Sequence, residues 1–182
     1  MRHDLAHALQ TDRLSLVQPA AEHVGAMARL ANNAKIHAMM ARLPYPYGED
    51  DARLYVEQIA PGPHEHCFAI LREGDELIGT VGLHLVEGEW PELGYWLGEP
   101  YWGQGYGTEA ARAVVEMARA ADCPGLRARA LAGNAASLNV LRKLGFVDNG
   151  EGCEPDGATH AGAPAVLLAL ALAPLAREAL PW

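Results

Sequence analysis

The chain has 182 residues, with 14 lysines and arginines against 23 aspartates and glutamates, and a formal net charge of -9. This length suits one domain, and the 50% content of hydrophobic residues is globular rather than disordered. The acidic balance argues against a general nucleic-acid binder, because contact with the phosphate backbone requires a basic surface.

Cysteine usage and hydropathy narrow the class of protein further. Cys67, Cys123 and Cys153 are far apart and odd in number, so no disulfide framework and no C-x-x-C metal site is expected. His64 and His66 have no third ligand near them in the sequence, so no bound metal is expected. The first ten residues are charged and no run of about 18 apolar residues occurs, so we expect no signal peptide and no membrane span. A cytoplasmic protein fits these features.

The first half of the chain predicts a strand, a set of short helices and three consecutive strands. Alternating apolar residues indicate the strands, and apolar residues at helical spacing indicate the helices. Three acids at positions 49–51 suit a helix N-terminus, whereas the prolines of 44–48 block a helix. The expected elements are a strand at Arg13–Gln18, helices at Ala20–Asn32, at Ala34–Arg42 and from Glu49 to Pro61, and strands at Cys67–Arg72, Leu77–Val86 and Pro91–Leu97.

Two glycines in the first half of the chain predict particular backbone conformations. Gly74 lies between two strands and is available for a positive φ in a hairpin turn. Gly94 lies inside the third strand of the set, where a glycine indicates a bulge or a close backbone approach.

The second half predicts alternating helices and strands. Gly145 is suited to end a helix, since glycine readily adopts the left-handed conformation that follows a helix C-terminus. The segment Pro174–Trp182 is left without assignment. The expected elements are helices at Thr108–Ala121, with Ala111, Val114, Val115 and Ala118 facing the core, and at Asn134–Leu144, strands at Leu126–Leu131, Phe146–Asn149 and Ala165–Leu172, and a loop at Glu151–Ala163. The resulting order, β-αα-β-β-β-α-β-α-β-β, is that of a mixed α/β domain with an antiparallel front half.

The most informative segment is a glycine loop between a strand and a helix. Gly103, Gly105 and Gly107 alternate with Gln104 and Tyr106, and Thr108 follows. Glycine allows close backbone approach, and the unpaired N–H groups of a helix start favour a phosphate. A nucleotide P-loop is excluded because no lysine precedes Thr108, and the spacing does not fit a dinucleotide fingerprint. A tight strand-to-helix turn without a ligand stays open as an alternative.

This loop resembles the acyl-CoA pyrophosphate loop of the GNAT superfamily of N-acetyltransferases. Other segments of the chain resemble motifs of that superfamily in the same order: Thr11–Leu14, Glu92–Leu97, Asn134–Ser137 and Arg142–Phe146. The similarity extends over about residues 11–172 of a single domain, 1–182, and is greatest to the ribosomal-protein N-terminal acetyltransferases. It implies a largely antiparallel central sheet with a splayed parallel pair, flanked by helices.

Two positions depart from the superfamily pattern. Trp102 stands where a polar residue is common, although tryptophan is usual in this branch. Leu141 stands where many members carry a tyrosine that protonates the departing thiolate, and leucine cannot donate a proton. A non-catalytic acyl-CoA-binding or regulatory domain is therefore an alternative to an enzyme.

The resemblance implies which residues bind acetyl-CoA. Gly103, Gln104, Gly105, Tyr106, Gly107 and Thr108 are expected to hold the pyrophosphate. A bulge over Gly94–Leu97 is expected to splay the strand, and pantetheine is expected to pair with backbone at Trp96, Leu97 and Gly98. Asn134 is expected to cap its helix and also to contact pantetheine, while Ser137 is expected to contact the cofactor and to act as the acid for the thiolate.

Acetyl transfer also needs a proton acceptor, because only a neutral amine attacks the thioester. Glu92 is the first candidate, since strand alternation places it on one face with Gly94 and Trp96. His84 is the second, because an imidazole has a neutral form near pH 7. Each has a purely structural alternative, an exposed carboxylate for Glu92 and a hydrogen-bonded histidine for His84.

These residues predict an acetyl-CoA-dependent N-acetyltransferase acting on a primary amine. The branch it resembles makes a protein N-terminal α-amine the first acceptor, and a small cationic amine of the antibiotic or polyamine type is the alternative. The acceptor is expected among the first two helices, the Pro44–Gly48 loop and the Glu151–Ala163 loop. A homodimer is plausible from the resemblance, and neither nucleic acid nor membrane is expected as a partner.

Overall fold

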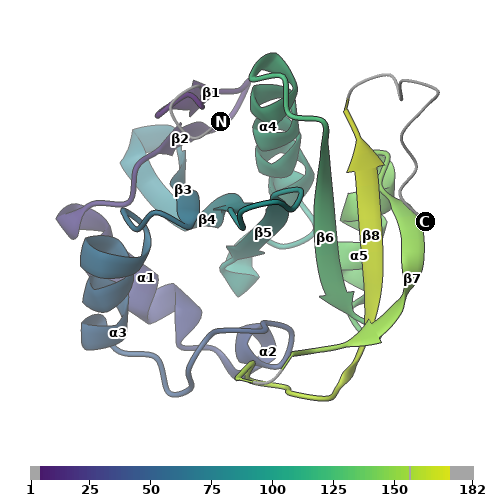
Figure 1. The fold of residues 1–182 in the computed structure, drawn as a ribbon. Helices are drawn as coiled ribbons and strands as arrows, with labels where there is room; N and C mark the ends of the chain where they lie inside the picture. Colours follow the sequence, from purple (N-terminus) through teal and green to yellow (C-terminus); the bar gives the residue numbers. More distant parts are fainter. Residues whose placement is uncertain (1–4, 156, 173–182) are drawn as a thin grey trace.

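The computed structural model describes residues 5–155 and 157–172; the unassigned segment Pro174–Trp182 lies outside them. Eight strands form one sheet in the order β1-β2-β3-β4-β5-β6-β8-β7 (Figure 1). Every neighbouring pair is antiparallel except β5 and β6, which are parallel. The strands are β1 (Leu9–Gln10), β2 (Ser15–Val17), β3 (Glu65–Arg72), β4 (Glu76–His84), β5 (Glu92–Leu97), β6 (Gly125–Leu131), β7 (Val147–Cys153) and β8 (Pro164–Ala171).

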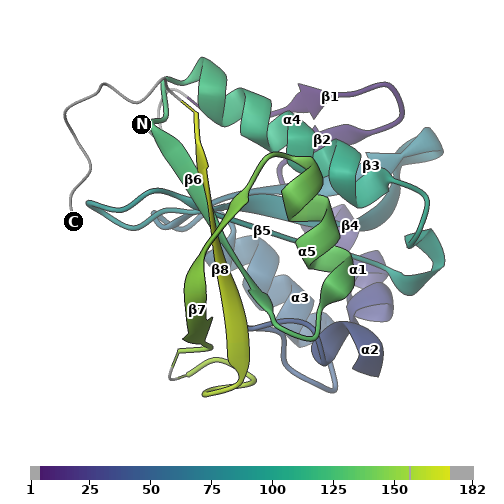
Figure 2. The same ribbon diagram turned by 90° about the vertical axis from the view of Figure 1, so that its right-hand side faces the viewer.

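Helices cover both faces of the sheet. One core packs α4 (Tyr106–Ala120) and α5 (Ala135–Lys143) against the sheet through residues such as Phe68 and Leu93. A second core packs α1 (Val24–Ala31), α2 (Ala34–His37) and α3 (Glu49–Leu54) on the other face, where Trp96 joins it. Figure 2 shows α4 above β3–β5 and α1–α3 below them. The mixed α/β class, the antiparallel front half and the splayed parallel pair are thereby confirmed.

The long helix and the turns follow the sequence pattern closely. The expected core residues of α4, Ala111, Val114, Val115 and Ala118, are all buried. Gly74 has φ +72° in the turn between β3 and β4, and Gly145 has φ +93° after α5. Asn134 caps α5 by accepting a hydrogen bond from the Ser137 N–H at 3.1 Å.

Several expected boundaries were wrong. The helix expected from Ala20 starts at Val24, after a short 3₁₀ turn. The helix expected to reach Arg42 ends at His37, because the chain turns back there and brings the Leu43 carbonyl to 2.8 Å from the Nδ1 atom of His37. The third helix is α-helical only to Leu54 and continues as a π-helical turn at Tyr55–Ile59. The short strand β1 was not predicted.

The strand β7 also differs from the prediction, which ended it at Asn149. A break in its register with β8, between Asp148 and Glu151, absorbs the extra residues, and Gly150 adopts φ +116° there. The strand then continues to Cys153, so the expected loop begins only at Glu154. No helix among the described residues is long and apolar enough to cross a membrane.

Candidate active site

The glycine loop forms the turn into α4. Gly103 and Gly105 have φ of +72° and +83°, a left-handed conformation that side chains other than glycine rarely adopt. Because Gly105 is the N-cap, α4 begins at Tyr106, two residues earlier than expected. The N–H groups of Tyr106, Gly107 and Thr108 belong to the first turn and have no intrahelical acceptor. They form a donor set at the positive end of a 15-residue helix.

Side chains fix the loop on both sides. The Trp102 indole donates to the Leu97 carbonyl at 2.8 Å, and the Gln104 amide donates to the Pro100 carbonyl at 2.9 Å. Arg13 donates to the Gln104 carbonyl at 3.1 Å, and its guanidinium lies 4.5 Å from the centre of the Tyr106 ring. The loop is therefore held in one shape before any ligand arrives, with a cation beside it.

Glu109, in the first turn of α4, joins this loop to the start of β2. Its carboxylate accepts from the Thr11 hydroxyl at 2.6 Å and from the Arg13 Nε at 2.7 Å. Burial alone raises the pKa of Glu109, but the hydrogen bonds from Thr11 and Arg13 outweigh it and lower the pKa. The ionised carboxylate thus contributes to the stability of the fold.

Glu109→Gln is expected to lower the free energy of unfolding by about 1 kcal/mol, since one charge-assisted pair is lost at a partly exposed site. The folded-state pKa lies below the ordinary value of 4.5, so the contribution is complete above that pH and disappears as pH falls toward the folded-state pKa. Urea unfolding at pH 7 and pH 3.5 measures this. Glu116→Gln, in an exposed pair with Arg119 on the same helix, is the control. An equal loss in both variants, or a difference independent of pH, would contradict the assignment.

The strands β5 and β6 separate soon after they meet. Their pairing is Glu92 with Arg127, supported by a bond from the Arg127 N–H to the Pro91 carbonyl at 2.9 Å. The bulge expected in β5 is absent from its pairing with β4, which is unbroken from Glu92 to Leu97. A Cβ on Gly94 would meet nothing within 4 Å, so this glycine leaves open space rather than interrupting the strand. The splay opens on the β6 side of β5.

The three backbone positions expected to meet pantetheine lie along and just after this splayed strand. Trp96 is largely buried and packs toward α1–α3. The Leu97 carbonyl accepts from the Trp102 indole, and the Gly98 N–H donates to the Ile78 carbonyl at 2.9 Å. Because Trp96 also pairs with Thr80 of β4, all three positions already have a protein partner, and the Leu97 carbonyl retains a second lone pair for a ligand.

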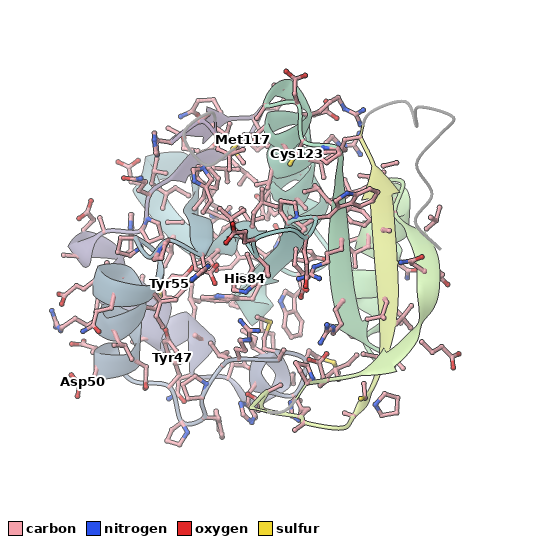
Figure 3. The ribbon with its side chains drawn as sticks, viewed as in Figure 1. Tyr47, Asp50, Tyr55, His84, Met117 and Cys123 are labelled. Carbon is pink, nitrogen blue, oxygen red and sulfur yellow. The ribbon has the colours of Figure 1, made fainter. Side chains whose placement is uncertain are left out.

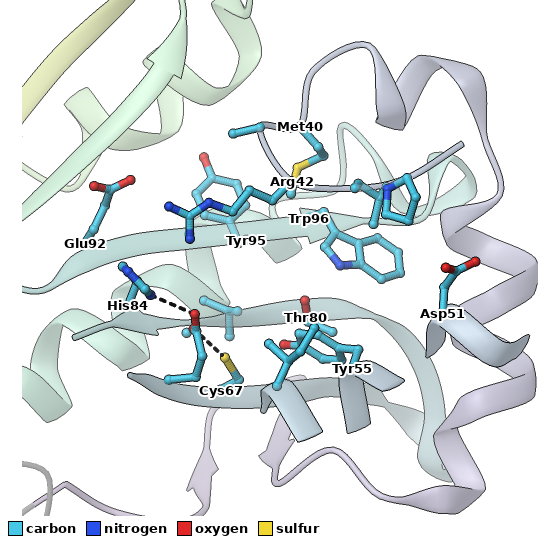
Figure 4. A pocket seen from close by; sticks show the side chains of 18 of the residues that line it. Met40, Arg42, Asp51, Tyr55, Cys67, Thr80, His84, Glu92, Tyr95 and Trp96 are labelled. Carbon is cyan, nitrogen blue, oxygen red and sulfur yellow. Dashed lines mark hydrogen bonds and ion pairs between the residues drawn. The ribbon is translucent and has the colours of Figure 1, made fainter. Parts of the chain in front are cut away.

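A cavity of about 320 Å³ lies on the α1–α3 side of the sheet, beside the splay (Figure 4). Its floor is formed by β3, β4 and β5, and further walls come from the 40–47 segment and from the residues that follow β7. The acceptor segments expected from the sequence thus line one cavity. The lining includes the apolar residues Met27, Met40, Leu43, Tyr55 and Trp96 and the charged residues Arg42, Asp51, Glu65, Glu92, Arg129 and Glu154.

Both candidate bases line this cavity and are cross-strand neighbours. His84 Nδ1 lies 2.8 Å from Glu65 Oε1, so the carboxylate fixes the orientation of the imidazole. Glu92 Oε2 lies 3.4 Å from Arg127 Nε, and Arg127 also pairs with Glu89. Figure 4 shows His84 and Glu92 side by side at one end of the cavity.

The tyrosines of the cavity are unsuited to accept a proton. Burial, with a smaller contribution from Asp51, raises the pKa of Tyr47 to about 12. Burial also raises the pKa of Tyr55 well above its ordinary value. Both phenols therefore stay protonated at neutral pH.

Ser137, in the first turn of α5, meets a tyrosine that the sequence analysis did not assign to the site. The Tyr95 hydroxyl lies 3.1 Å from Ser137 Oγ and 3.5 Å from the Ser137 carbonyl. Burial raises the pKa of Tyr95, although its bond to Ser137 opposes the shift. Leu141 is 1% exposed and belongs to the core, so its side chain is structural. Two hydroxyls are thus paired where β5 meets α5.

Sequence reasoning missed Glu154, Arg129, Arg13 and Tyr95. Glu154 follows the unexpected extension of β7, and only the fold buries it. Arg129 alternates with the buried Ala128 and Ala130, so the period of β6 could have placed it on the same face as Arg127. For Arg13 and Tyr95 the contacts span 91 and 42 residues, which no local pattern reveals.

Figure 3 shows Tyr55 beside α3 and His84 nearer the middle of the molecule, and both residues line the cavity.

The sequence model of the acetyltransferase (GNAT) domain family matches residues 13–147. The uncharacterised N-acetyltransferase p20 of Bacillus licheniformis is 24% identical over 148 residues, which cover 78% of this chain and 83% of that protein.

Solved structures of similar fold include two ribosomal-protein acetyltransferases. RimL, the ribosomal L7/L12 α-N-protein acetyltransferase in complex with coenzyme A, has a TM-score of 0.78 and 20% identity over 90% of this chain and 97% of that one. The ribosomal-protein-S5-alanine acetyltransferase of Vibrio fischeri has a TM-score of 0.76 and 17% identity over 96% and 99%. Fold and family agree: the chain belongs to the GNAT acetyltransferase family.

Proposed function

We propose that this enzyme transfers an acetyl group from acetyl-CoA to a primary amine bound in the cavity beside β5. The observation that carries the proposal is the parting of β5 and β6 directly between the glycine loop and that cavity. A thioester lying in the splay would reach both sides of the sheet. The ligand named in the RimL structure, coenzyme A, supports the same cofactor.

The loop residues fit an acyl-CoA pyrophosphate. Gly103, Gly105 and Gly107 expose backbone without side chains, and an added Cβ on Gly103 meets nothing within 4 Å, so the space before the loop is open. The N–H groups from Tyr106 to Thr108, together with Gln104 and the nearby Arg13, are proposed to bind the phosphates. Trp96, Leu97 and Gly98 are proposed to contact pantetheine, and Asn134 keeps its role as cap with a proposed contact to the same arm.

Acetyl-CoA supplies an activated acyl group, and the protein must remove a proton from the amine and accommodate the thiolate. We assign the first task to Glu92, with His84, oriented by Glu65, as the alternative. The second task falls to Ser137, whose hydroxyl is paired with that of Tyr95. The carbon–nitrogen bond forms as the carbon–sulfur bond breaks, and the amine proton leaves to the base.

An α-amine is the acceptor that needs least help, since its pKa is about 8 and that of an alkylammonium is about 10. Two solved structures of similar fold are ribosomal-protein acetyltransferases, so a protein N-terminal α-amine is the first candidate for the acetyl acceptor. The acidic residues lining the cavity keep a small cationic amine as the second.

Calorimetric titration of the protein with acetyl-CoA, CoA and ATP tests the cofactor, and thiol release with a panel of amines and short peptides tests the transfer. Binding of acetyl-CoA and CoA without ATP, followed by amine-dependent thiol release, is the expected result. Absence of acetyl-CoA binding would overturn the proposal. Binding without turnover on any amine would favour a regulatory acyl-CoA-binding domain instead.

Glu92→Gln tests the assignment of the base. We expect kcat/KM to fall about 10²-fold near neutral pH and the acidic limb of its pH profile to flatten, because the group whose protonation blocks the reaction is gone. The profile is measured from pH 5 to 9 beside that of His84→Gln. If the acidic limb of the pH profile of kcat/KM is unchanged in Glu92→Gln but lost in His84→Gln, His84 is the base.

A further inference from the structure

The cavity contains two oppositely charged side chains that have no partner among the residues that the structure describes. Glu154 is 3% exposed, and its Oε2 atom is buried without a hydrogen bond. The Nε of Arg129 is also buried without a hydrogen bond. Among the described residues, no ion pair or hydrogen bond of either side chain occurs, although both residues line the same cavity.

The other acids of the cavity are satisfied. Glu65 pairs with His84, Glu92 lies near Arg127, and Asp51 accepts from the Gly48 N–H at 2.8 Å. Arg42 extends along β5 in Figure 4, toward the end of the cavity where Glu92 and His84 lie, but it is exposed and therefore hydrated. Glu154, which is buried, and Arg129, which is half-buried with a buried Nε, are thus the cavity's two side chains of opposite charge that have no partner among the described residues.

An unpaired charge in a buried site is unfavourable, because water no longer solvates it and no counter-charge replaces the water. A bound ligand that supplies the missing hydrogen-bond or ion-pair partner accounts for such a group. Pairing with each other would have satisfied both side chains, yet the structure keeps them apart. A ligand that satisfies both must itself carry a cation and an anion.

The positions of the two residues separate these charges in space. Arg129 lies two residues beyond Arg127 on the same face of β6. Since Arg127 pairs with Glu92, Arg129 lies near the level of Gly94, where β5 and β6 have separated. Glu154 follows the end of β7, where its N–H donates to the Ala163 carbonyl at 2.9 Å. The apolar lining residues, Met27, Met40, Leu43, Tyr55 and Trp96, lie in the same cavity.

We propose that the acceptor is a free α-amino acid with an apolar side chain, whose ammonium meets Glu154 and whose carboxylate meets Arg129. This proposal rests on the proposed function, amine acetylation, and puts a free amino acid in place of the protein N-terminus as the first acceptor. The volume of about 320 Å³ is at the lower end of small-molecule sites and suits one amino acid. A protein N-terminus has a neutral amide where a free amino acid has its carboxylate, and it would leave Arg129 unpaired.

The same arrangement explains product release. The ammonium first gives one proton to the base and becomes a neutral amine. As the carbon–nitrogen bond forms and the carbon–sulfur bond breaks, the nitrogen loses a second proton, the departing thiolate takes up one proton to leave as CoA thiol, and the nitrogen becomes a neutral amide. Glu154 then loses its cation, while the carboxylate stays at Arg129. The product should therefore bind more weakly than the substrate.

A matched set of acceptors tests the proposal: phenylalanine, phenylalaninamide, phenethylamine and the dipeptide Phe-Gly, each followed by thiol release from acetyl-CoA. The expected kcat/KM for phenylalanine exceeds that for the amide and for the amine at least tenfold. Arg129→Gln is expected to remove this preference, so that kcat/KM for phenylalanine comes within about threefold of kcat/KM for phenethylamine. Arg129→Lys, which keeps the charge, should restore part of it.

Arg142→Gln removes the same charge from an exposed pair with Asp148 outside the cavity and serves as the control. Thermal denaturation and acetyl-CoA titration check that each variant folds and binds the cofactor. If the amide and the dipeptide react as well as the amino acid, or Arg129→Gln leaves the ratio unchanged, the amino-acid proposal is wrong while acetyl transfer stands. If no amine releases thiol, the proposed function fails first.

Discussion

Gly105→Val is expected to weaken binding of CoA at least tenfold, which corresponds to about 1.4 kcal/mol. Gly105 has φ +83°, a conformation that a β-branched residue strongly disfavours, so the loop must change shape. A side chain at this position would also project into the space where the backbone N–H groups of α4 meet a phosphate. Calorimetric titration with CoA measures the effect.

Gly74→Val is the matched control. Gly74 has φ +72° and lies in the turn between β3 and β4. An added Cβ at Gly74 meets nothing within 4 Å, whereas one at Gly105 lies 3.4 Å from Arg13 Nη2. Both variants are expected to lose stability through backbone strain, whereas only Gly105→Val loses affinity for CoA. Unchanged affinity in Gly105→Val, or equal losses in the two variants, would remove the phosphate-binding role from the loop.

The parts of the fold that the sequence predicts are those with a local cause. The period of α4 gives its buried face, Asn134 and Gly145 mark the ends of α5, and Gly74 marks a hairpin. In each case the signal lies within one element. The errors occur where distant residues decide, as in β7, which pairs with β8 beyond the point where its own sequence indicates a loop.

The residues of the candidate site also fall into those that a local sequence motif predicts and those that only the fold brings together. Gly103 to Thr108, Asn134 and Ser137 belong to motifs that are contiguous in sequence, so a resemblance could assign them. The groups that the fold brings to them come from far away: Arg13 to the glycine loop and Tyr95 to Ser137. Glu154 and the Nε of Arg129 are unusual only because they are buried without a partner among the described residues, and burial of a polar group has no local signature.

Ser137→Ala is expected to lower kcat at least tenfold while leaving the affinity for CoA within about twofold, because the hydroxyl acts on the departing thiolate. The helix cap survives this change, since the Ser137 backbone N–H donates to Asn134. Steady-state kinetics and CoA titration give the two numbers. An equal loss of turnover and affinity would make Ser137 a binding residue.

Tyr95→Phe extends this test to the partner of Ser137. When the Tyr95 hydroxyl donates to Ser137 Oγ, the serine proton is free to point at the sulfur, and the bond received makes that proton more acidic. We therefore expect kcat to fall by about threefold to tenfold, with no further loss when Tyr95→Phe is added to Ser137→Ala. Tyr101→Phe, which removes a hydroxyl bonded to Glu76, controls for the loss of a phenol. A tyrosine that works only through the serine has no effect on kcat once the serine hydroxyl is absent. If the losses of kcat in Tyr95→Phe and Ser137→Ala multiply in the double variant, the tyrosine acts through packing instead.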